Sequence, residues 1–241
     1  MSHPPVLLFD FDGVLLTQKA LEYSALFHLR KEFYKWENLD KLRLIDFARL
    51  FEESDSSNRF KAIFQTYKAY SPYLPSRWRR IIFFIRFRQM YPKYEIYDTI
   101  VPELEKILPI LKTSKFLLGI VSNTSQNRLN SFKERLNLDQ YFSVYISRDD
   151  TPYRKPNPYP IYLALKKLKS EFKIPIIKSQ TYLIGDLPSD IKTAKNAMVK
   201  SIAILSGHGR KGDLEKANPT IILKDLSELL DLEPIKKFLI K

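Results

Sequence analysis

The feature that most constrains the fold is an uninterrupted apolar run at residues 6–9, which ends at two aspartates and a glycine. Such a run is typical of a strand buried on both faces of a parallel sheet. Asp10 and Asp12 follow it two positions apart, so on an extended chain they point the same way. Ligands of open α/β sheets bind at the carboxyl ends of the strands. The pattern therefore predicts two carboxylates at the ligand-binding edge of a sheet, with a plain acidic turn as the alternative for this pair taken alone.

Strand and helix patterns alternate from about residue 98 to the end of the chain. Five further strands are predicted at residues 116–121, 142–146, 182–184, 201–205 and 220–223. Helices are predicted at residues 98–111, 126–136, 158–170, 189–197 and 226–230. A loop carrying Gly207, Gly209 and Gly212 is expected after the fifth strand. This alternation indicates an α/β fold with a doubly wound parallel sheet.

Residues 17–95 carry helical patterns and no strand pattern. Helices are expected around residues 21–33, 44–51, 60–67 and 76–90, with Pro72 and Pro75 before the last one. A strand-to-helix loop usually has about 2–6 residues, so an insertion this long is expected to form an all-helical cap domain. It leaves the carboxyl end of the first strand, where it can lie as a lid over the ligand crevice. The predicted domains are a core of residues 1–16 and 96–241 and a cap of residues 17–95.

The helix expected at residues 76–90 has two apolar faces. At about 100° per residue, one face carries Trp78, Ile81, Ile82 and Ile85, and the nearly opposite face carries Phe83, Phe84, Phe87, Met90 and Tyr91. Arginines run between the two faces on both sides. A helix on the outside of a small bundle needs only one apolar face. We therefore expect one face to pack within the cap and the other to meet the core, the substrate crevice or a second subunit.

Composition narrows the class of protein. With 44% apolar and 28% charged residues, the chain has the make-up of a folded protein. It has no cysteine, which excludes disulfides and thiolate metal sites, and its three histidines are scattered along the chain. The apolar runs are too short to span a bilayer and the first strand begins too early for a signal peptide, so we expect a cytoplasmic protein with no membrane partner. The net charge of +13 favours anionic partners, or reflects a lysine-rich surface of the kind found in proteins from hot environments.

Further polar clusters follow the later predicted strands. In chain order they are Ser122 with Asn123, Arg154 with Lys155, and Asp186 with Asp190. A parallel sheet brings the carboxyl ends of its strands to one edge, so these clusters are expected to converge on Asp10 and Asp12. Carboxylates placed close together repel one another, and Mg²⁺ would relieve that repulsion. A lysine and a hydroxyl nearby could neutralise the oxygens of a phosphoryl group.

The four clusters together resemble the motifs of the haloacid dehalogenase superfamily, and the resemblance covers nearly the whole chain. The motifs are Asp10-Phe11-Asp12-Gly13, Ser122-Asn123, Lys155-Pro156, and Gly185-Asp186 through Asp190. The resemblance implies a Rossmann-like core and a helical cap of the family's first type. One departure is the sequence Ala197-Met198-Val199, where the family often has Ala-Gly-Met, so the local turn is in doubt.

The resemblance also implies a role for each site residue. Asp10 would be the nucleophile that forms an aspartyl-phosphate, and Asp12 would protonate the leaving oxygen and then activate water. Ser122, Asn123 and Lys155 would bind the phosphoryl group. Mg²⁺ would be held by Asp10, the Asp12 backbone carbonyl and Asp186, while Asp190 would support the metal through water or orient Lys155.

Several residues have a plainer interpretation. Asp190 could be an ordinary charge at a helix N-terminus, and Asn123 could simply begin a turn. Arg154 is expected to be a surface charge. His208 could face the crevice, but we expect a solvated loop histidine.

The function that these patterns favour is Mg²⁺-dependent hydrolysis of a small phosphorylated metabolite. The dehalogenases themselves usually lack the second aspartate, because a halide needs no proton to leave, so Asp12 favours phosphoester chemistry. The alternatives are a phosphomutase on the same scaffold, or a non-enzymatic basic module that binds nucleic acid or an acidic partner. No nucleic-acid-binding motif is present, and we expect no specific nucleic-acid partner. A monomer or a homodimer is expected.

Overall fold

The computed structural model describes residues 3–17, 19–21, 29–32, 67–68, 70–114 and 116–239. The chain divides into two compact units, one formed by Met1–Leu16 with Ile100–Lys241 and the other by Thr17–Thr99. We call them the core unit and the inserted unit. Thr17 and Thr99 mark the passage between them, because Thr17 N donates to Thr99 O at 2.8 Å and Thr99 N donates to Thr17 Oγ1 at 2.9 Å. The units divide after residues 16 and 99, whereas the predicted domain boundaries lie after residues 16 and 95.

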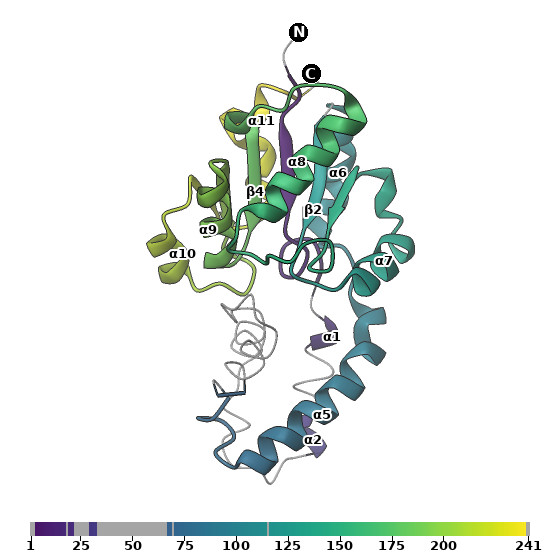
Figure 1. Cartoon of the computed structure of the whole chain (residues 1–241), viewed down its shortest axis with the longest axis vertical. Coiled ribbons are helices and arrows are strands. Elements are labelled where there is room, and N and C mark those ends of the chain that lie inside the picture. The colour runs from purple at the N-terminus through teal and green to yellow at the C-terminus, as the bar shows by residue number, and fades with distance from the viewer. Residues whose placement is uncertain are drawn as a thin grey trace. The chain divides into compact units, whose positions relative to one another are not determined.

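The core unit is built on a parallel sheet of six strands (Figure 1). The strands are β1 (Val6–Phe9), β2 (Leu117–Val121), β3 (Val144–Ile146), β4 (Thr181–Gly185), β5 (Lys200–Ile204) and β6 (Ile221–Leu223). Their order in the sheet is β3-β2-β1-β4-β5-β6, and every neighbouring pair is parallel. The predicted doubly wound, Rossmann-like sheet is therefore confirmed. β1 lies between β2 and β4, and all four of its residues are buried.

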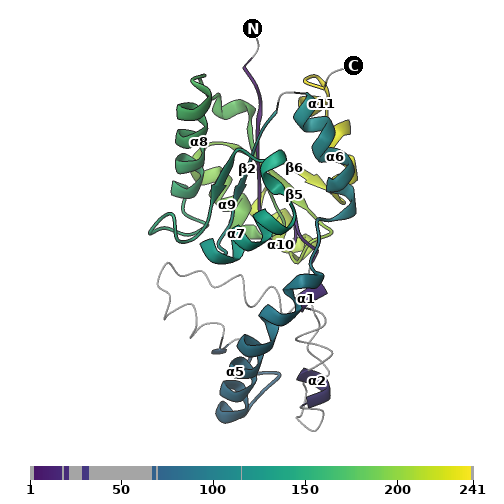
Figure 2. The same cartoon turned by 90° about the vertical axis from the view of Figure 1, so that its right-hand side faces the viewer.

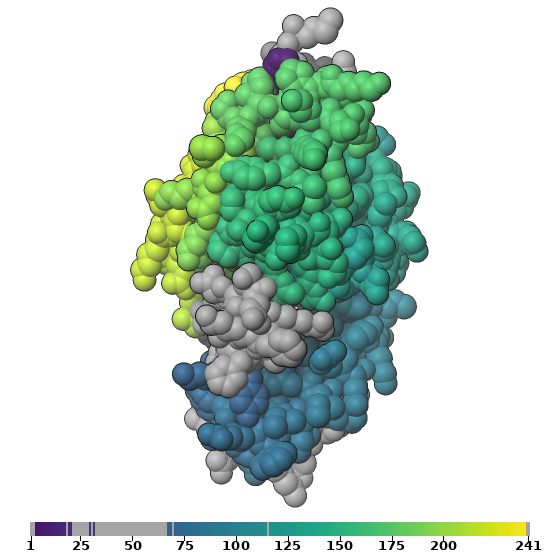
Figure 3. Space-filling view, in the orientation of Figure 1, coloured from purple at the N-terminus to yellow at the C-terminus, as the bar shows by residue number. Residues whose placement is uncertain are grey.

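Helices cover both faces of this sheet. Figure 2 shows α8 (Tyr159–Phe172) and α9 (Pro188–Ala197) on one side and α6 (Pro102–Thr113) and α11 (Glu233–Lys236) on the other. Residues of the α8 region, in green, form a large part of the visible surface of the core unit in Figure 3. The remaining elements of the core unit are α7 (Gln126–Arg135), α10 (Lys211–Ala217) and the 3₁₀ helices η4 (Leu138–Gln140), η5 (Lys178–Gln180) and η6 (Leu226–Asp231).

Three predictions for the core unit differ from the structure in detail. α6 begins at Pro102 and not at residue 98, since a residue that precedes proline disfavours helical backbone, and Val101 is extended. The predicted last helix at 226–230 is the 3₁₀ helix η6. Gly212 does not lie in a loop, because it belongs to the first turn of α10. A short helix with glycine in it has little helical propensity to detect.

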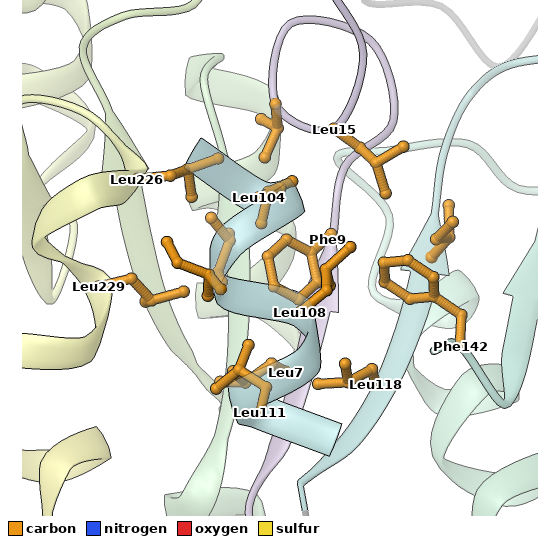
Figure 4. Close-up of a cluster of buried hydrophobic side chains, with 14 of the residues drawn as sticks. Leu7, Phe9, Leu15, Leu104, Leu108, Leu111, Leu118, Phe142, Leu226 and Leu229 are labelled. Atoms are coloured by element: carbon orange, nitrogen blue, oxygen red, sulfur yellow. The ribbon is translucent and has the colours of Figure 1, made fainter. Parts of the chain in front are cut away.

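Most of the buried hydrophobic side chains of the core unit form two large clusters, one on each face of the sheet. Along β1, Leu7 and Phe9 belong to the cluster on the α6 side, and Val6 and Leu8 belong to the cluster on the α8 side. This alternation follows from the two-residue period of a strand. Figure 4 shows the first cluster, with the leucines of α6 packed against Leu7 and Phe9. The two clusters fix β1 in the middle of the sheet, which holds the end of this strand in place.

In the part of the inserted unit that the structure describes, the regular elements are helices. Its elements are α1 (Lys19–Leu21), α2 (Leu29–Glu32), α5 (Arg77–Tyr94) and the 3₁₀ helix η3 (Glu95–Tyr97). The predicted helix at 21–33 falls partly on α1 and α2, whereas the predicted helix at 44–51 and nearly all of that at 60–67 lie outside the described residues. The Ser76 side chain caps α5 by accepting from Arg79 N. α5 runs past its predicted end at residue 90, and Pro92 removes one backbone hydrogen bond in its last turn.

The inward side of α5 confirms half of the two-face prediction. Phe83, Phe87 and Met90 are buried in a cluster with Leu29, Tyr70 and Leu74. The side chains of the other face are exposed, from Trp78 at 76% to Ile81 at 40%, with Ile82 and Ile85 between them. What contacts that second face stays a prediction. No helix in the described part of the chain is both long enough and apolar enough to cross a membrane.

Candidate functional site

The ends of three neighbouring strands place polar residues side by side at the carboxyl edge of the sheet. Asp10 follows β1, Ser122 follows β2 and Asp186 follows β4. The backbone of two of them continues the sheet, since Asp10 N donates to Ile184 O at 2.8 Å and Ser122 N donates to Ile146 O at 2.9 Å. The side chains of all three polar residues are buried. Sequence-distant residues thus meet here because β1 is the central strand.

Lys155 reaches this edge from the loop between β3 and α8. Its Nζ atom lies 2.7 Å from Asp10 Oδ1 and 2.6 Å from Asp190 Oδ1, and all three residues are buried. Asn123 holds the backbone of this lysine: Lys155 N donates to Asn123 Oδ1 at 3.1 Å, and Asn123 Nδ2 donates to Lys155 O at 3.5 Å. The Asn123 side chain therefore positions the loop that carries Lys155, and its predicted contact with a phosphoryl group stays a prediction.

Asp190 lies in the first turn of α9 and has two partners. Its Oδ2 atom accepts from Leu187 N at 3.0 Å, which caps the helix, and its Oδ1 atom accepts from Lys155. Both interpretations of this residue from the sequence, a charge at a helix N-terminus and an orienting partner of Lys155, thus describe the same carboxylate.

Burial and the neighbouring charges shift the pKa values of the groups in this cluster. Burial raises the pKa of Asp10 well above the usual value, and the nearby carboxylates of Asp190 and Asp186 raise it further, while Lys155 opposes them. Burial also raises the pKa of Asp190, again against the effect of Lys155. Burial lowers the pKa of Lys155, but Asp10 and Asp190 outweigh it, so the net pKa is raised and the ammonium stays charged. Among the described residues, the ammonium of Lys155 therefore balances only part of the negative charge of the three buried carboxylates.

The donor set fits a hard divalent cation. Carboxylate oxygens of Asp10, Asp186 and Asp190 lie within 4.8 Å of one another. Asp186 Oδ1 is buried and accepts no hydrogen bond from the described residues, although its Oδ2 atom does. A buried carboxylate oxygen without a donor is costly in a folded protein, and metal coordination would satisfy it. These residues fit a Mg²⁺ site of the kind that the sequence predicts.

The prediction for His208 was wrong. The residue is buried rather than solvated: its backbone N donates to Asp186 Oδ2 at 2.7 Å, and its Nδ1 atom lies 3.2 Å from the same oxygen. The loop can fold this closely over the strand end because Gly209 has no side chain, since a Cβ atom there would lie 1.9 Å from Asp186 O. The glycines on either side of His208 were the signal that could have placed it in the site.

Asp12 lies apart from the three-carboxylate cluster and has its own cation. Both carboxylate oxygens accept from Arg128 Nη1 at 2.8 Å. The turn that aims Asp12 depends on Gly13, which has a φ of +76°, a conformation that side chains disfavour. Arg128 was not predicted from the sequence, where its only signal is its place in the first turn of the helix after Ser122-Asn123. Its contact with Asp12 adds a residue to the candidate site.

Known proteins resemble this chain in sequence and in fold. The model of the haloacid dehalogenase-like hydrolase family matches residues 7–204. Pyrophosphatase PpaX of Bacillus mycoides (strain KBAB4) is 24% identical over 233 residues, which cover 94% of this chain and 95% of that protein. Among solved structures, a predicted phosphoglycolate phosphatase of Haemophilus somnus 129pt is 18% identical, with a TM-score of 0.66 and coverage of 96% and 98%. CbbY of Rhodobacter sphaeroides in complex with phosphate is 16% identical, with a TM-score of 0.64 and coverage of 95% and 100%. The solved structures share the fold of this chain.

Proposed function

Since the chain belongs to the haloacid dehalogenase-like hydrolase family, we propose that it is a Mg²⁺-dependent phosphatase that acts on a small phosphorylated metabolite through an aspartyl-phosphate. The observation that carries this proposal is the buried cluster of Asp10, Asp186 and Asp190 around Lys155. Two proteins similar to this chain are named for the hydrolysis of phosphorylated compounds, a pyrophosphatase and a predicted phosphoglycolate phosphatase. Their names support the same type of reaction here.

The proposed chemistry begins at Asp10. Its carboxylate attacks phosphorus, so that a bond forms between Asp10 and phosphorus while the bond from phosphorus to the leaving oxygen breaks. Asp12 gives a proton to that oxygen, and then accepts a proton from the water that hydrolyses the aspartyl-phosphate. Asp10 is thereby regenerated and inorganic phosphate leaves.

The other residues hold the charges in place. Lys155 neutralises Asp10 and the phosphoryl oxygens, and its buried ammonium is already fixed by Asp190. Ser122 offers a hydroxyl at the adjacent strand end, and we keep Asn123 as a proposed phosphate contact. Mg²⁺ would be held by Asp10, Asp186 and the Asp12 backbone carbonyl with support from Asp190. When bound, it would polarise the phosphoryl group and shield it from the negative nucleophile.

A phosphate-release assay over a panel of phosphorylated metabolites, with and without Mg²⁺, tests the proposal. We expect Mg²⁺-dependent release that Asp10→Asn abolishes without loss of the fold, because the substitution removes the nucleophile's charge and hardly changes its volume. Asp231→Asn is the matched control, since Asp231 is exposed in the 3₁₀ helix η6. Substantial turnover by Asp10→Asn, with contaminating phosphatase excluded, would refute the aspartyl-phosphate.

The same assay separates the alternatives. A phosphomutase would convert one sugar phosphate into an isomer with little release of phosphate. A nucleic-acid-binding module would hydrolyse no phosphoester and would bind nucleic acid with a steep dependence on salt. The cytoplasmic location and the monomeric or dimeric state stay predictions, and size-exclusion chromatography with light scattering would measure the latter.

A further inference from the structure

Arg80 is a buried arginine of the inserted unit that has no acidic partner among the described residues. The residue is only 7% exposed, and its Nε atom is buried without a hydrogen-bond acceptor. Its guanidinium contacts an aromatic ring, since the guanidinium carbon lies 4.5 Å from the ring centroid of Tyr67. We propose that Arg80 and Tyr67 form a binding site within the inserted unit for a small oxyanion, a phosphate or a carboxylate.

The first argument is the cost of burying this charge. A charged side chain in a protein interior normally has an opposite charge or several hydrogen bonds that replace its lost hydration. Arginine stays ionised, so it cannot avoid this cost by losing its proton. The buried Lys155 of the core unit has two carboxylate partners, whereas no carboxylate among the described residues pairs with Arg80. A bound oxyanion would supply the missing opposite charge.

The second argument is the position of Arg80 in the first turn of α5. The N-terminus of a helix carries a partial positive charge, which favours an anion there and disfavours a buried cation. The first turn of α5 has no acidic residue. Residues 67–94 contain seven Lys or Arg residues and no Asp or Glu. The positive charge of this stretch is therefore not balanced within it, and it attracts anions toward Arg80.

The third argument concerns the kind of anion that fits. The ring of Tyr67 covers one face of the guanidinium, and the Tyr67 hydroxyl donates to Arg77 O at 3.2 Å, which holds the ring in place. The N–H donors lie along the edge of the guanidinium, where their spacing matches the oxygens of a carboxylate or a phosphate. A residue that is 7% exposed lies too deep to meet a nucleic-acid backbone or another broad surface. The ligand is therefore a small anion.

Melting temperatures measured in EDTA test this site without catalysis. The wild type, Arg80→Met and the control Arg88→Met are each compared in sodium phosphate and in sodium chloride of equal ionic strength. Methionine removes the charge and keeps an extended side chain. Arg88 is the matched control, because it lies exposed on the same helix. The general stabilising effect of phosphate, and any phosphate that binds near Lys155, act on all three proteins alike.

We expect phosphate at about 100 times its dissociation constant to raise the melting temperature of the wild type by about 5–10 °C more than that of Arg80→Met. Arg88→Met should respond like the wild type. In heteronuclear NMR spectra, the Nε–H signal that is missing from Arg80→Met should shift in the wild type when phosphate is added. If Arg80→Met does not fold, Arg80→Lys takes its place, and the gain from phosphate should shrink because lysine lacks the planar fork.

Two results would overturn the proposal. One is an equal gain from phosphate in the wild type and in the Arg80 variant, which would place the bound phosphate elsewhere. The other is an Arg80 Nε–H signal that phosphate leaves unchanged. Neither measurement requires turnover, so both are decided independently of the proposed function.

A kinetic comparison identifies the source of the anion. If the anion is a group of the substrate, Arg80→Met should lower kcat/KM for 2-phosphoglycolate about tenfold or more relative to ethyl phosphate, an ester of similar size without a carboxylate. If the anion is a separate small ion, this ratio should stay unchanged while the gain from phosphate is still lost. Both results support the site, and only this comparison rests on the proposed function.

Discussion

The ammonium of Lys155 lies 2.7 Å from a carboxylate oxygen of Asp10, and both side chains are buried. A second carboxylate, from Asp190, contacts the same ammonium at 2.6 Å. Burying a charge is tolerated when an opposite charge compensates for the lost hydration. The cluster therefore depends on one lysine for its stability as well as for its proposed chemistry.

Replacing Lys155 should destabilise the protein in the absence of metal. Lys155→Met leaves buried carboxylates without their cation, which typically costs about 3–5 kcal/mol of the free energy of unfolding. Urea denaturation in EDTA measures the loss. Lys167→Met is the control, because Lys167 is exposed and pairs with Asp150 at 3.3 Å, and such pairs are worth at most about 1 kcal/mol. Equal losses in the two variants would show that the Lys155 cluster does not contribute as described.

Mg²⁺ should stabilise the protein more as the pH rises. The pKa values of Asp10 and Asp190 are higher in the folded protein than the value of about 3.9 in the unfolded chain, so the folded protein binds protons at these groups more tightly. Both groups therefore stabilise the fold fully below about pH 3.9, and this stabilisation is lost as the pH rises through their raised pKa values. Mg²⁺ binds the ionised carboxylates, so its stabilising effect grows over the same interval.

Urea denaturation with EDTA and with Mg²⁺, at about pH 5 and about pH 8, measures this effect. At each pH, the difference between the free energies of unfolding with Mg²⁺ and with EDTA cancels the contributions of titratable groups outside the site. In activity assays Ca²⁺ should replace Mg²⁺ poorly, because it accepts more ligands at longer range. A gain from Mg²⁺ that is the same at both pH values would contradict the prediction, and full activity in metal-free buffer would remove Asp186 as a ligand.

His208→Asn should weaken Mg²⁺ binding. The Nδ1 atom of the imidazole lies 3.2 Å from Asp186 Oδ2. The other carboxylate oxygen, Oδ1, accepts no hydrogen bond from the described residues and is the proposed metal ligand. Partners that orient a metal ligand typically contribute about 10–100-fold to metal affinity. Isothermal titration calorimetry with Mg²⁺ measures the change, and His3→Asn serves as the control. An unchanged affinity would mean that the backbone contact of His208 alone positions Asp186.

Asp12→Ala should slow poor leaving groups more than good ones. An alkyl phosphate requires a proton on the leaving oxygen, whereas an aryl phosphate requires it much less. The ratio of kcat/KM for the two esters in wild type and variant measures the effect, under conditions where chemistry and not product release limits the rate. Equal losses would argue against an acid role for Asp12.

The sheet could be predicted from the sequence because each strand is a short apolar run that ends at a polar residue. Phe9 to Asp10 and Val121 to Ser122 are such endings, and a parallel sheet must bring them to one edge. Arg128 could not be predicted, because its contact with Asp12 depends on the direction of a long side chain from a helix. For His208 the neighbouring glycines signal a close approach of the backbone, but they do not specify how the loop folds over Asp186, and the burial of the imidazole depends on that fold.

The two faces of α5 lead to the last prediction. Phe87 is only 3% exposed, and the half-buried Phe84 contacts Tyr70 with ring centroids 5.1 Å apart. On the opposite face Trp78 is 76% exposed and Ile82 is 44% exposed. The first pair is therefore part of the packing of the inserted unit, and the second pair contributes little to the stability of a single chain.

We expect Phe84→Ser with Phe87→Ser to lower the free energy of unfolding by at least about 3 kcal/mol, as for other truncations of buried aromatic residues. Trp78→Ser with Ile82→Ser is the matched control on the same helix and should cost less than about 1 kcal/mol, as surface changes usually do. Thermal melting and urea denaturation compare the two double variants, and light scattering reports their mass. If the protein is a dimer and only the second double variant becomes monomeric, the exposed face is the subunit contact. If both double variants melt like the wild type, with unchanged mass and kinetics, the two-face assignment of α5 is wrong.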